Sequence, residues 1–348
     1  MAIAALVAFF LCLQGLRLAA AQSLNSIASA INNLPVLYDT SDIRLVKASH
    51  GLDSFWASSF IRTTDNRRFL VSANVIIQNG AAIQRAGILS LDDPLSTFPR
   101  NYLGLVLADG SDGTAELFNI TTHDGRFSME TISNSNSAAE AFPSMRIFSA
   151  LPDTEFDIDI NMHGPAILNA GLGSFQWGGG IEHQISLPAA RPSGTLVVGN
   201  KTLTIDSRNS LTWYDRQWGP TLPDGFTWFG LYVAGPDNSQ CYLSVWNWQD
   251  SIDGDKAFVT IQNKRASGNT VIPIAAFEAS DTLVFNSPAS GRAYPLQYTV
   301  TLGDGKKFRV KSFRPDQEYV MDGSTYGFYS GYVEVDGDYT GFGVIDIP

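Results

Sequence analysis

The residues best suited to chemistry lie close together near the middle of the chain. Leu211–Pro220 reads LTWYDRQWGP, so three aromatic rings, a carboxylate, a guanidinium and an amide occur within ten residues. On a strand, Asp215 shares one face with Trp213, whereas Tyr214 and Arg216 lie on the other. A carboxylic acid between bulky aromatic rings is desolvated, which raises its pKa and lets it hold a proton near neutrality. Asp215 is therefore a candidate general acid.

The same stretch also has a structural interpretation, which composition alone favours. Asp215 would then form an ion pair with Arg216, or cap a turn, and hold two domains together. A second titratable pair, Glu182 and His183, precedes the motif. In acid–base chemistry, Asp215 or Glu182 would be the general acid, with the other carboxylate or His183 as the base. The competing interpretation of Glu182 and His183 is a solvated pair on a barrel rim.

Aromatic residues are concentrated in the same region. Six of the seven tryptophans lie between residues 177 and 248, and Asn247 stands between two of them, where it is placed to hydrogen-bond a substrate oxygen. Such rings can line an apolar pocket, although a tryptophan on a strand is more often part of the core. The candidate substrate-binding residues are Trp177, Trp213, Tyr214, Trp218, Trp228, Tyr232, Trp246 and Asn247.

The elements that must position these residues are strands. Phe69–Ile77, Phe156–Ile160 and Phe308–Lys311 alternate in polarity or are rich in β-branched and aromatic types. Hairpin signals separate such segments, among them Asp124-Gly125 and Asp304-Gly305. Helical periodicity is nearly absent outside a short stretch at residues 23–33. The sequence therefore predicts an antiparallel all-β fold, either a sandwich or a barrel.

The length of 348 residues predicts two domains or one large one. The proline-containing segment Leu187–Gly194 is typical of a long loop or crossing segment, and Gly199-Asn200 is typical of a hairpin turn. A second cluster of turn formers follows the aromatic motif. We place one domain at residues 22–210 and a second at residues 211–348, each long enough for a small ligand-holding barrel.

The N-terminus has the features of a targeting segment. Residues 1–13 are almost wholly apolar, and Ala19-Ala20-Ala21 fits a signal-peptidase site, so residues 1–21 are expected to be a cleaved signal peptide. The alternative is an uncleaved N-terminal anchor. We expect a secreted protein without stable membrane insertion, glycosylated at the sequons that begin at Asn119 and Asn200. Cys241 is then the single remaining cysteine, expected as a buried core thiol.

Composition excludes several classes of function. Acidic residues (34) exceed basic ones (23), the net charge is −11, and no basic cluster offsets it, so nucleic-acid binding is not expected. No phosphate-binding loop, nucleophile elbow or HExxH zinc motif occurs. The four histidines are widely spaced, and no metal is expected. A glycosidase stays open, because the chain is acidic, rich in tryptophan and supplied with carboxylates.

Several stretches together resemble a known family. Trp213–Gly219, WYDRQWG, resembles the central motif of the secreted fungal kievitone-hydratase-like proteins, in a double-lipocalin superfamily with the carotenoid 1,2-hydratases and the fungal Diels–Alderases. Ser49–Trp56 is similar to the first strand of that family, 178–188 to the strand before the motif, and Gly331–Gly337 to the closing strands. The likeness spans nearly the whole chain after residue 21. The carotenoid enzymes carry a histidine-containing motif where this chain has Asp-Arg-Gln.

The resemblance implies two lipocalin-like β-barrels, a ligand pocket near the cleft between them, and no metal or redox cofactor. It also implies one of two reactions. A hydratase protonates an alkene, stabilises the cation on aromatic faces and activates water. A pericyclase instead holds a polyene in a reactive shape without moving a proton. We favour a hydratase acting on a prenylated, polyketide or terpenoid natural product, with a pericyclase as the alternative and a non-catalytic carrier of a hydrophobic ligand as a further one.

Overall fold

The computed structural model describes residues 51–78, 80–108, 119–132, 144–162, 164–177, 180–219, 225–249, 251, 254–264 and 268–348. This part is built from β-strands, with two short 3-10 turns, η2 (Asn169–Gly171) and η3 (Ser207–Asn209). It contains no helix long and apolar enough to cross a membrane. The predicted all-β class is confirmed. The expected signal peptide at residues 1–21 and the helical stretch at 23–33 lie outside the described residues.

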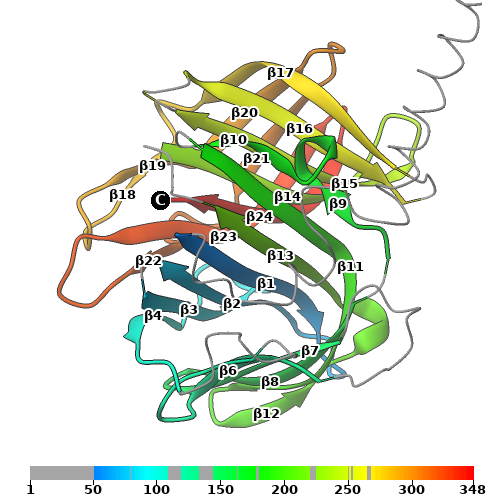
Figure 1. Cartoon of the computed structure of the whole chain (residues 1–348). Helices are drawn as coiled ribbons and strands as arrows, with labels where there is room; N and C mark the ends of the chain where they lie inside the picture. The colour runs from blue at the N-terminus through cyan, green and yellow to red at the C-terminus, as the bar shows by residue number, and fades with distance from the viewer. Residues whose placement is uncertain are drawn as a thin grey trace, which may run out of the picture. The chain divides into compact units, whose positions relative to one another are not determined.

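The first sheet curls into a half-barrel (Figure 1). Its main path runs β4-β3-β2-β1-β13-β11-β8-β7-β6-β5, and β9, β10 and β12 pair with β11 beside that path. The strands are β1 (Leu52–Arg62), β2 (Arg68–Gln78), β3 (Ala81–Ser90), β4 (Arg100–Leu105), β5 (Asn119–Thr121), β6 (Phe127–Thr131), β7 (Met145–Leu151), β8 (Thr154–Asn161), β9 (Ile167–Leu168), β10 (Ser174–Trp177), β11 (Gly180–Val198), β12 (Lys201–Thr204) and β13 (Leu211–Gly219).

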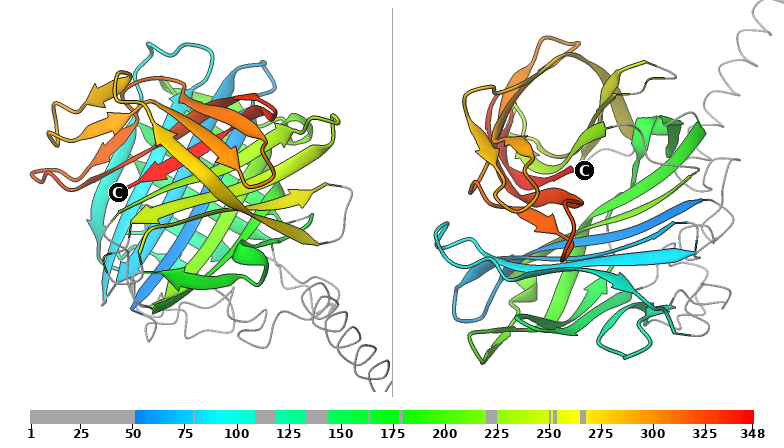
Figure 2. Two further views of the ribbon diagram at one scale, coloured as in Figure 1. Left: turned by 90° about the horizontal axis from the view of Figure 1, so that it is seen from above. Right: turned by 90° about the vertical axis from the view of Figure 1, so that its left-hand side faces the viewer.

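The second sheet closes on itself. Its order is β21-β20-β17-β16-β15-β14-β24-β23-β22, and β21 also pairs with β23, which makes an 8-strand barrel, seen end-on in the right panel of Figure 2. The strands are β14 (Gly225–Ala234), β15 (Gln240–Gln249), β16 (Lys256–Asn263), β17 (Asn269–Ala279), β20 (Gln297–Leu302), β21 (Lys307–Ser312), β22 (Glu318–Val320), β23 (Gly327–Gly337) and β24 (Thr340–Ile347). A separate hairpin joins β18 (Val284–Asn286) to β19 (Ala293–Pro295). The predicted lipocalin-like architecture is confirmed.

Local sequence explains many of the strands and turns. The alternating segment at residues 156–160 lies in β8, where buried and exposed positions alternate. The predicted turn at Gly199-Asn200 joins β11 to β12, and both residues have positive φ angles, 57° and 63°. Such angles suit glycine and asparagine in a tight hairpin. Asp124-Gly125 and Asp304-Gly305 likewise lie in turns, between β5 and β6 and between β20 and β21.

Leu187–Gly194, predicted as a long loop or crossing segment, is not a loop but crosses between two partner strands. These residues lie inside β11, a strand of 19 residues. Up to Leu187 the strand pairs with β13, its register shifts between Leu187 and Ala190, and from Arg191 onward it pairs with β8. Pro188 lies at this change of partner, where a β-bulge tolerates the missing N–H donor, whereas Pro192 lies opposite Ile160 in the part paired with β8. The segment therefore bends a continuous strand between two parts of the curled sheet.

The predicted domain boundary falls immediately before β13. That strand pairs with β1 and β11 in the curled sheet, and β14 is the first strand of the closed barrel. Sheet membership therefore changes one strand after residue 210, between Gly219 and Gly225. The aromatic motif belongs to the curled sheet.

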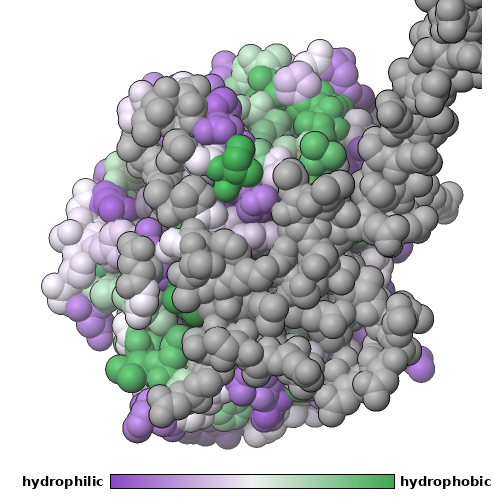
Figure 3. All heavy atoms as spheres, in the orientation of Figure 1, coloured by the Kyte–Doolittle hydropathy of each residue, from purple (hydrophilic) through white to green (hydrophobic). Residues whose placement is uncertain are grey.

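Three apolar clusters fill the described structure. One packs residues of the curled sheet such as Phe55 and Tyr214, and another packs residues of the closed barrel, including the buried thiol of Cys241, as predicted. The third contains most of the tryptophans and draws residues from both sheets, such as Trp56 of β1 and Trp228 of β14. On the face in Figure 3, hydrophobic residues form small patches separated by polar ones. The largest aromatic concentration is therefore buried between the sheets.

Candidate active site between the sheets

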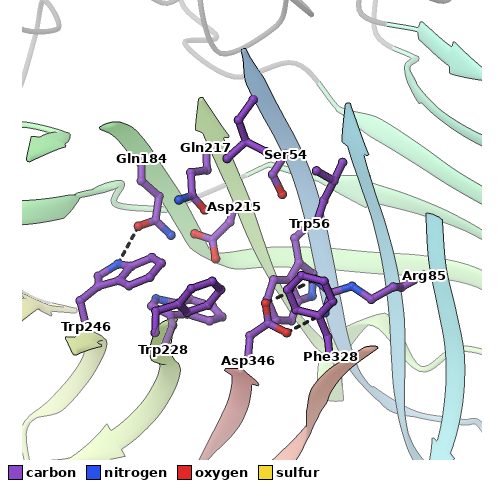
Figure 4. Close-up of a pocket in the computed structure, with 13 residues that line it drawn as sticks. Ser54, Trp56, Arg85, Gln184, Asp215, Gln217, Trp228, Trp246, Phe328 and Asp346 are labelled. Carbon is purple, nitrogen blue, oxygen red and sulfur yellow. Dashed lines mark hydrogen bonds and ion pairs between the residues drawn. The ribbon is translucent and has the colours of Figure 1, made fainter. Parts of the chain in front are cut away.

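A pocket lies in the aromatic cluster between the curled sheet and the closed barrel (Figure 4). Its free volume is about 30 Å³, room for roughly one or two water-sized molecules. The lining residues are Leu52, Ser54, Trp56, Ile76, Arg85, Gln184, Asp215, Gln217, Phe226, Trp228, Trp246, Phe328 and Asp346.

Asp215 reaches the pocket from β13. Strand alternation places Trp213, Asp215 and Gln217 on the face toward the closed barrel, as the sequence predicts. The Trp213 indole N–H donates a hydrogen bond to Asp215 Oδ2 at 3.0 Å. The other oxygen has no partner at hydrogen-bonding geometry among the described residues, although Ser186 and Gln184 lie near the carboxyl group. Burial raises the pKa of Asp215 to about 7, against the lowering effect of these neighbours.

A second carboxylate faces the pocket from the opposite sheet. Asp346 of β24 accepts from both terminal nitrogens of Arg85 of β3, at 2.6 and 3.3 Å, and both residues are buried. Arg85 Nε donates to Asn74 Oδ1 at 2.9 Å, which fixes the guanidinium. Burial raises the pKa of Asp346, whereas Arg85 and Ser330 oppose that rise. The pocket thus holds one carboxyl group without a cationic partner and one held by a guanidinium.

Aromatic rings form the remaining walls. The rings of Trp56 and Trp228, one from each sheet, have centroids 5.1 Å apart. The Trp246 indole N–H donates to Gln184 Oε1 at 2.8 Å, which ties β15 to β11. Arg85 Cζ lies 4.4 Å from the centre of the Phe328 ring. These faces carry the negative side of the ring quadrupole, which stabilises a nearby cation.

The other face of β13 carries a different polar group. Arg216 pairs with Asp53 of β1, and both side chains are almost wholly buried. The Arg216 guanidinium lies 4.2 Å from the centre of the Phe55 ring and 4.9 Å from that of Trp218. The alternative interpretation of the motif, an ion pair between Asp215 and Arg216, is therefore not what the structure shows: consecutive residues of this strand point to opposite faces.

Glu182 and His183 lie beside the pocket, outside its lining. Glu182 is buried on the same face of β11 as Gln184, and its carboxyl group packs over Gly219, where a Cβ atom would lie 1.7 Å from an oxygen. Burial raises the pKa of Glu182 well above its ordinary value, against the lowering effect of the nearby Gln217. His183 lies on the opposite face and stacks on Trp218, with ring centres 5.1 Å apart.

The structure divides the predicted substrate-binding residues into three groups. Trp228 and Trp246 line the pocket. Trp177, Trp213 and Tyr232 belong to the same aromatic cluster and stand behind that first layer. The rest point elsewhere: Tyr214 packs in the core of the curled sheet, Trp218 stacks on His183, and Asn247 lies on the face of β15 opposite Trp246 and Trp248.

Sequence reasoning missed several pocket residues. Arg85 and Asp346 are 261 residues apart, and each occurs in ordinary strand sequence. The one local signal for Arg85 is a charged residue inside an otherwise apolar strand, β3, where burial requires a partner. Gln184 lies two residues from Glu182, within the stretch 178–188 that resembles a strand of the known family, but it was not among the predicted site residues. Among the described residues, no group of three or more His, Cys, Asp or Glu side chains is arranged to hold a metal ion.

No protein-family model matches the chain, but two curated proteins and several solved structures are similar to it. It is 28% identical over 330 residues to dehydratase asqC of Emericella nidulans, covering 90% of this chain and 89% of that protein. It is 26% identical over 324 residues to kievitone hydratase of Fusarium solani subsp. phaseoli, covering 90% and 87%. The crystal structure of kievitone hydratase from Nectria haematococca matches with a TM-score of 0.78 at 26% identity, over 92% of this chain and 94% of that one. The chain is thus similar to the kievitone hydratase-like proteins over about nine tenths of its length, in sequence and in fold.

The names of the two relatives indicate the class of reaction. The relatives are named as a hydratase and a dehydratase, which are the two directions of one reaction type, so the chain is an enzyme of the hydro-lyase class. A putative AttH protein from Nitrosomonas europaea shares the fold at a TM-score of 0.69 and 14% identity, over 87% of this chain and 94% of that one. The likeness in fold thus covers both the curled sheet and the barrel that enclose the pocket.

Proposed function

We propose that this protein is a secreted hydratase that adds water across an alkene of a prenylated, polyketide or terpenoid natural product. The observation that carries the proposal is the pair of buried carboxyl groups in one aromatic pocket, Asp215 without a cation and Asp346 held by Arg85. Two carboxyl groups whose environments differ in this way are suited to separate acid and base roles.

Asp215 is the proton donor in this mechanism. Its pKa of about 7 leaves a substantial protonated fraction near neutrality, whereas a carboxyl group in water would be ionised. The proton of Asp215 passes to one alkene carbon, and the positive charge forms on the neighbouring, more substituted carbon. The faces of Trp56, Trp228 and Trp246 stabilise that cation at a distance from bulk solvent.

Asp346 is the proton acceptor. The oxygen of a water molecule bonds to the cationic carbon, and one water proton passes to Asp346, which contact with Arg85 favours in its carboxylate form. The alkene has then gained one water, Asp215 has lost a proton and Asp346 has gained one. Proton exchange with solvent returns both carboxyl groups to their starting states. The reverse sequence is a dehydration with the two roles exchanged.

The proposal is tested with purified protein, a prenylated isoflavonoid and a panel of polyene precursors in water enriched in heavy oxygen. We expect a product heavier than its substrate by one labelled water, detected by mass spectrometry and lost in Asp215→Asn. Asp281→Asn is the matched control, because Asp281 is exposed and outside the pocket. An isomer of unchanged mass formed by both variants contradicts hydration and supports a pericyclase. Tight binding without conversion supports a carrier.

The secreted state is part of the proposal. It is supported by the apolar segment at residues 1–13 with its Ala19–Ala21 site, and by two sequons whose asparagines are exposed. Asn119 lies in β5 and Asn200 in the turn between β11 and β12, so both are accessible to a glycosyltransferase. N-terminal sequencing of protein recovered from the culture medium should begin at Gln22, and enzymatic deglycosylation should reduce its mass at Asn119 and Asn200. Material that stays inside the cell with Met1 intact contradicts this part.

A further inference from the structure

A second pocket, the outer pocket, lies on the other side of Arg85 from the first, inner pocket. It has a volume of about 240 Å³ and is formed where β4, an edge strand of the curled sheet, faces β22 and the β18–β19 hairpin. Its polar lining includes Arg100, Tyr102, Asp316, Glu318 and Tyr319. By volume it can hold several water molecules, whereas the inner pocket has room for one or two.

The wall of this outer pocket is preformed. Glu318 is buried and accepts hydrogen bonds from the hydroxyl groups of Ser287, Ser290 and Tyr294, the last at 2.7 Å. These bonds fasten the loop of the β18–β19 hairpin to β22. Across the pocket, Arg100 pairs with Asp316 at 2.6 Å and joins the two sheets. Hydrogen bonds and an ion pair within the protein therefore hold the polar lining of the pocket in place.

Two buried tyrosine hydroxyl groups stand between the outer pocket and the catalytic ion pair. Neither Tyr102 Oη nor Tyr319 Oη makes a hydrogen bond with normal geometry to a described residue, although Tyr326 and Ser72 lie near them. A buried hydroxyl group without a partner costs about 1–3 kcal/mol, so such a group beside a polar pocket is normally satisfied by water. Burial also raises both pKa values, that of Tyr319 to about 12, so both groups stay neutral and able to donate.

These hydroxyl groups lead to Arg85. Tyr102 is directly opposite Arg85 in the pairing of β3 with β4, on the same face. Tyr319 Oη packs on Gly87, two residues along that face, where a Cβ atom would lie 2.2 Å from the oxygen. Both tyrosines act electrostatically on Arg85, which holds Asp346 at 2.6 Å. A polar path thus runs from the outer pocket past two hydroxyl groups to the proposed base.

We propose that the outer pocket is a water compartment that supplies the nucleophile to Asp346 past Tyr102 and Tyr319. The inference rests on the proposed hydration. The inner pocket is walled by Trp56, Phe226, Trp228, Trp246 and Phe328, so a bound alkene closes it to water from its own side. Water then reaches the cationic carbon from the side of the ion pair. Tyr102 and Tyr319 are positioning residues in this scheme, because they orient water and do not touch the reacting carbon.

The route is tested by competition between water and methanol. Methanol that follows the same route captures the cation through its oxygen, loses its hydroxyl proton to Asp346 and gives a methyl ether. Ala289→Phe narrows the outer pocket, which Ala289 lines. We expect the ratio of ether to alcohol to fall about fivefold or more, since a narrower passage excludes methanol before water. Ala279→Phe, an exposed position on β17, is the matched control and should leave the ratio unchanged.

A double variant removes both tyrosine hydroxyl groups and keeps the shapes of the rings. Tyr102→Phe with Tyr319→Phe should lower kcat about tenfold or more and leave KM for the alkene unchanged, because the substrate contacts are intact. An unchanged product ratio in Ala289→Phe, or a KM effect without a kcat effect in the double variant, overturns the proposal. So does a crystal structure in which the organic substrate fills the outer pocket.

A failure of the proposed hydration can be distinguished from a failure of the water compartment. If the wild-type protein incorporates no labelled water, hydration itself is wrong. The water compartment is then judged by high-resolution crystallography of the wild-type protein alone. Ordered water bonded to both tyrosine hydroxyl groups is the expected result, and a dry pocket overturns the inference whatever the enzyme catalyses.

Discussion

The two faces of β13 bury similar chemical groups with different consequences. On one face Arg216 pairs with Asp53 and lies between aromatic rings. On the other face Asp215, the preceding residue, has a tryptophan N–H and no cation, and burial raises its pKa to about 7. Burial alone therefore does not mark a functional group. What distinguishes the pocket face is a titratable group left without a neutralising partner beside a space that a ligand can enter.

The largest expected effect is a difference in catalysis between Asp346 and Asp53, the two carboxylates that pair with a cation. Asp346→Asn removes the proposed base, and we expect the rate per folded molecule to fall by a factor of about 10² to 10⁴. Asp53→Asn, on the other face, should keep kcat within a factor of about three when both are compared below their melting temperatures. Steady-state kinetics with folded fractions from circular dichroism measure both. Equal losses in the two variants would show that the faces do not differ in function.

The next effect concerns stability. Arg216→Met leaves Asp53 buried without a cation, and we expect the free energy of unfolding to fall by about 3–5 kcal/mol. Adding Asp53→Leu should restore most of that loss, because the buried charge is then gone. Urea denaturation of the single and double variants makes the comparison. A double variant no more stable than the single one would contradict the view that this pair is chiefly compensated charge.

The ionisation of Asp215, on the pocket face of β13, should make both the reaction rate and the stability depend on pH. Hydration needs protonated Asp215, so the rate should fall about tenfold per pH unit above pH 7. For stability, the folded pKa of about 7 lies above the ordinary 3.8, so Asp215 favours the folded state least above pH 7 and the loss builds up between pH 4 and 7. Asp215→Asn should therefore gain stability over wild type as the pH rises through this window. Thermal melts at pH 5 and pH 8 measure the difference, and equal gaps at both would contradict it.

The smallest effect tests the tuning of Asp215 itself. Trp213→Phe removes the hydrogen bond from the indole N–H to Oδ2, which favours the carboxylate. A hydrogen bond of about 1 kcal/mol corresponds to roughly 0.7 pKa unit, so the alkaline limb of the pH–rate profile should move up by about that amount. Trp218→Phe, on the other face, is the control and should leave the limb in place. A downward shift in Trp213→Phe would mean that the indole stabilises the neutral acid.

The sequence-based predictions succeeded where the physics is local. Strand periodicity and turn residues such as Gly199-Asn200 depend on neighbours along the chain, and these features were found in the structure. The alternation within the aromatic motif also placed Asp215 and Arg216 on opposite faces. The loop predicted at Leu187–Gly194 was wrong because a proline, which usually breaks a strand, is tolerated at the bulge where β11 changes partners. That change of partner is a tertiary effect.

The site was only half visible in the sequence for a related reason. Asp215 stood out because desolvating aromatic residues surround it in the chain itself. Arg85 and Asp346 have no such surroundings, and their chemistry arises from contact between β3 and β24 on different sheets. Glu182 carried the right residue type at the right strand, yet it packs over Gly219 beside the pocket. Residue type and periodicity give the face of a strand but not which faces meet.

The bond between Arg85 and Asp346 also constrains the order of events during synthesis. The ribosome synthesises β3 long before β24, because 261 residues separate Arg85 from its counter-ion Asp346 along the chain. Until β24 docks, the growing chain presents a cation and exposed indole rings on one face of the curled sheet. Such a surface is a ready target for chaperones and a risk for aggregation. The pocket that holds both carboxyl groups is therefore complete only when β24, one of the last strands to be synthesised, has docked.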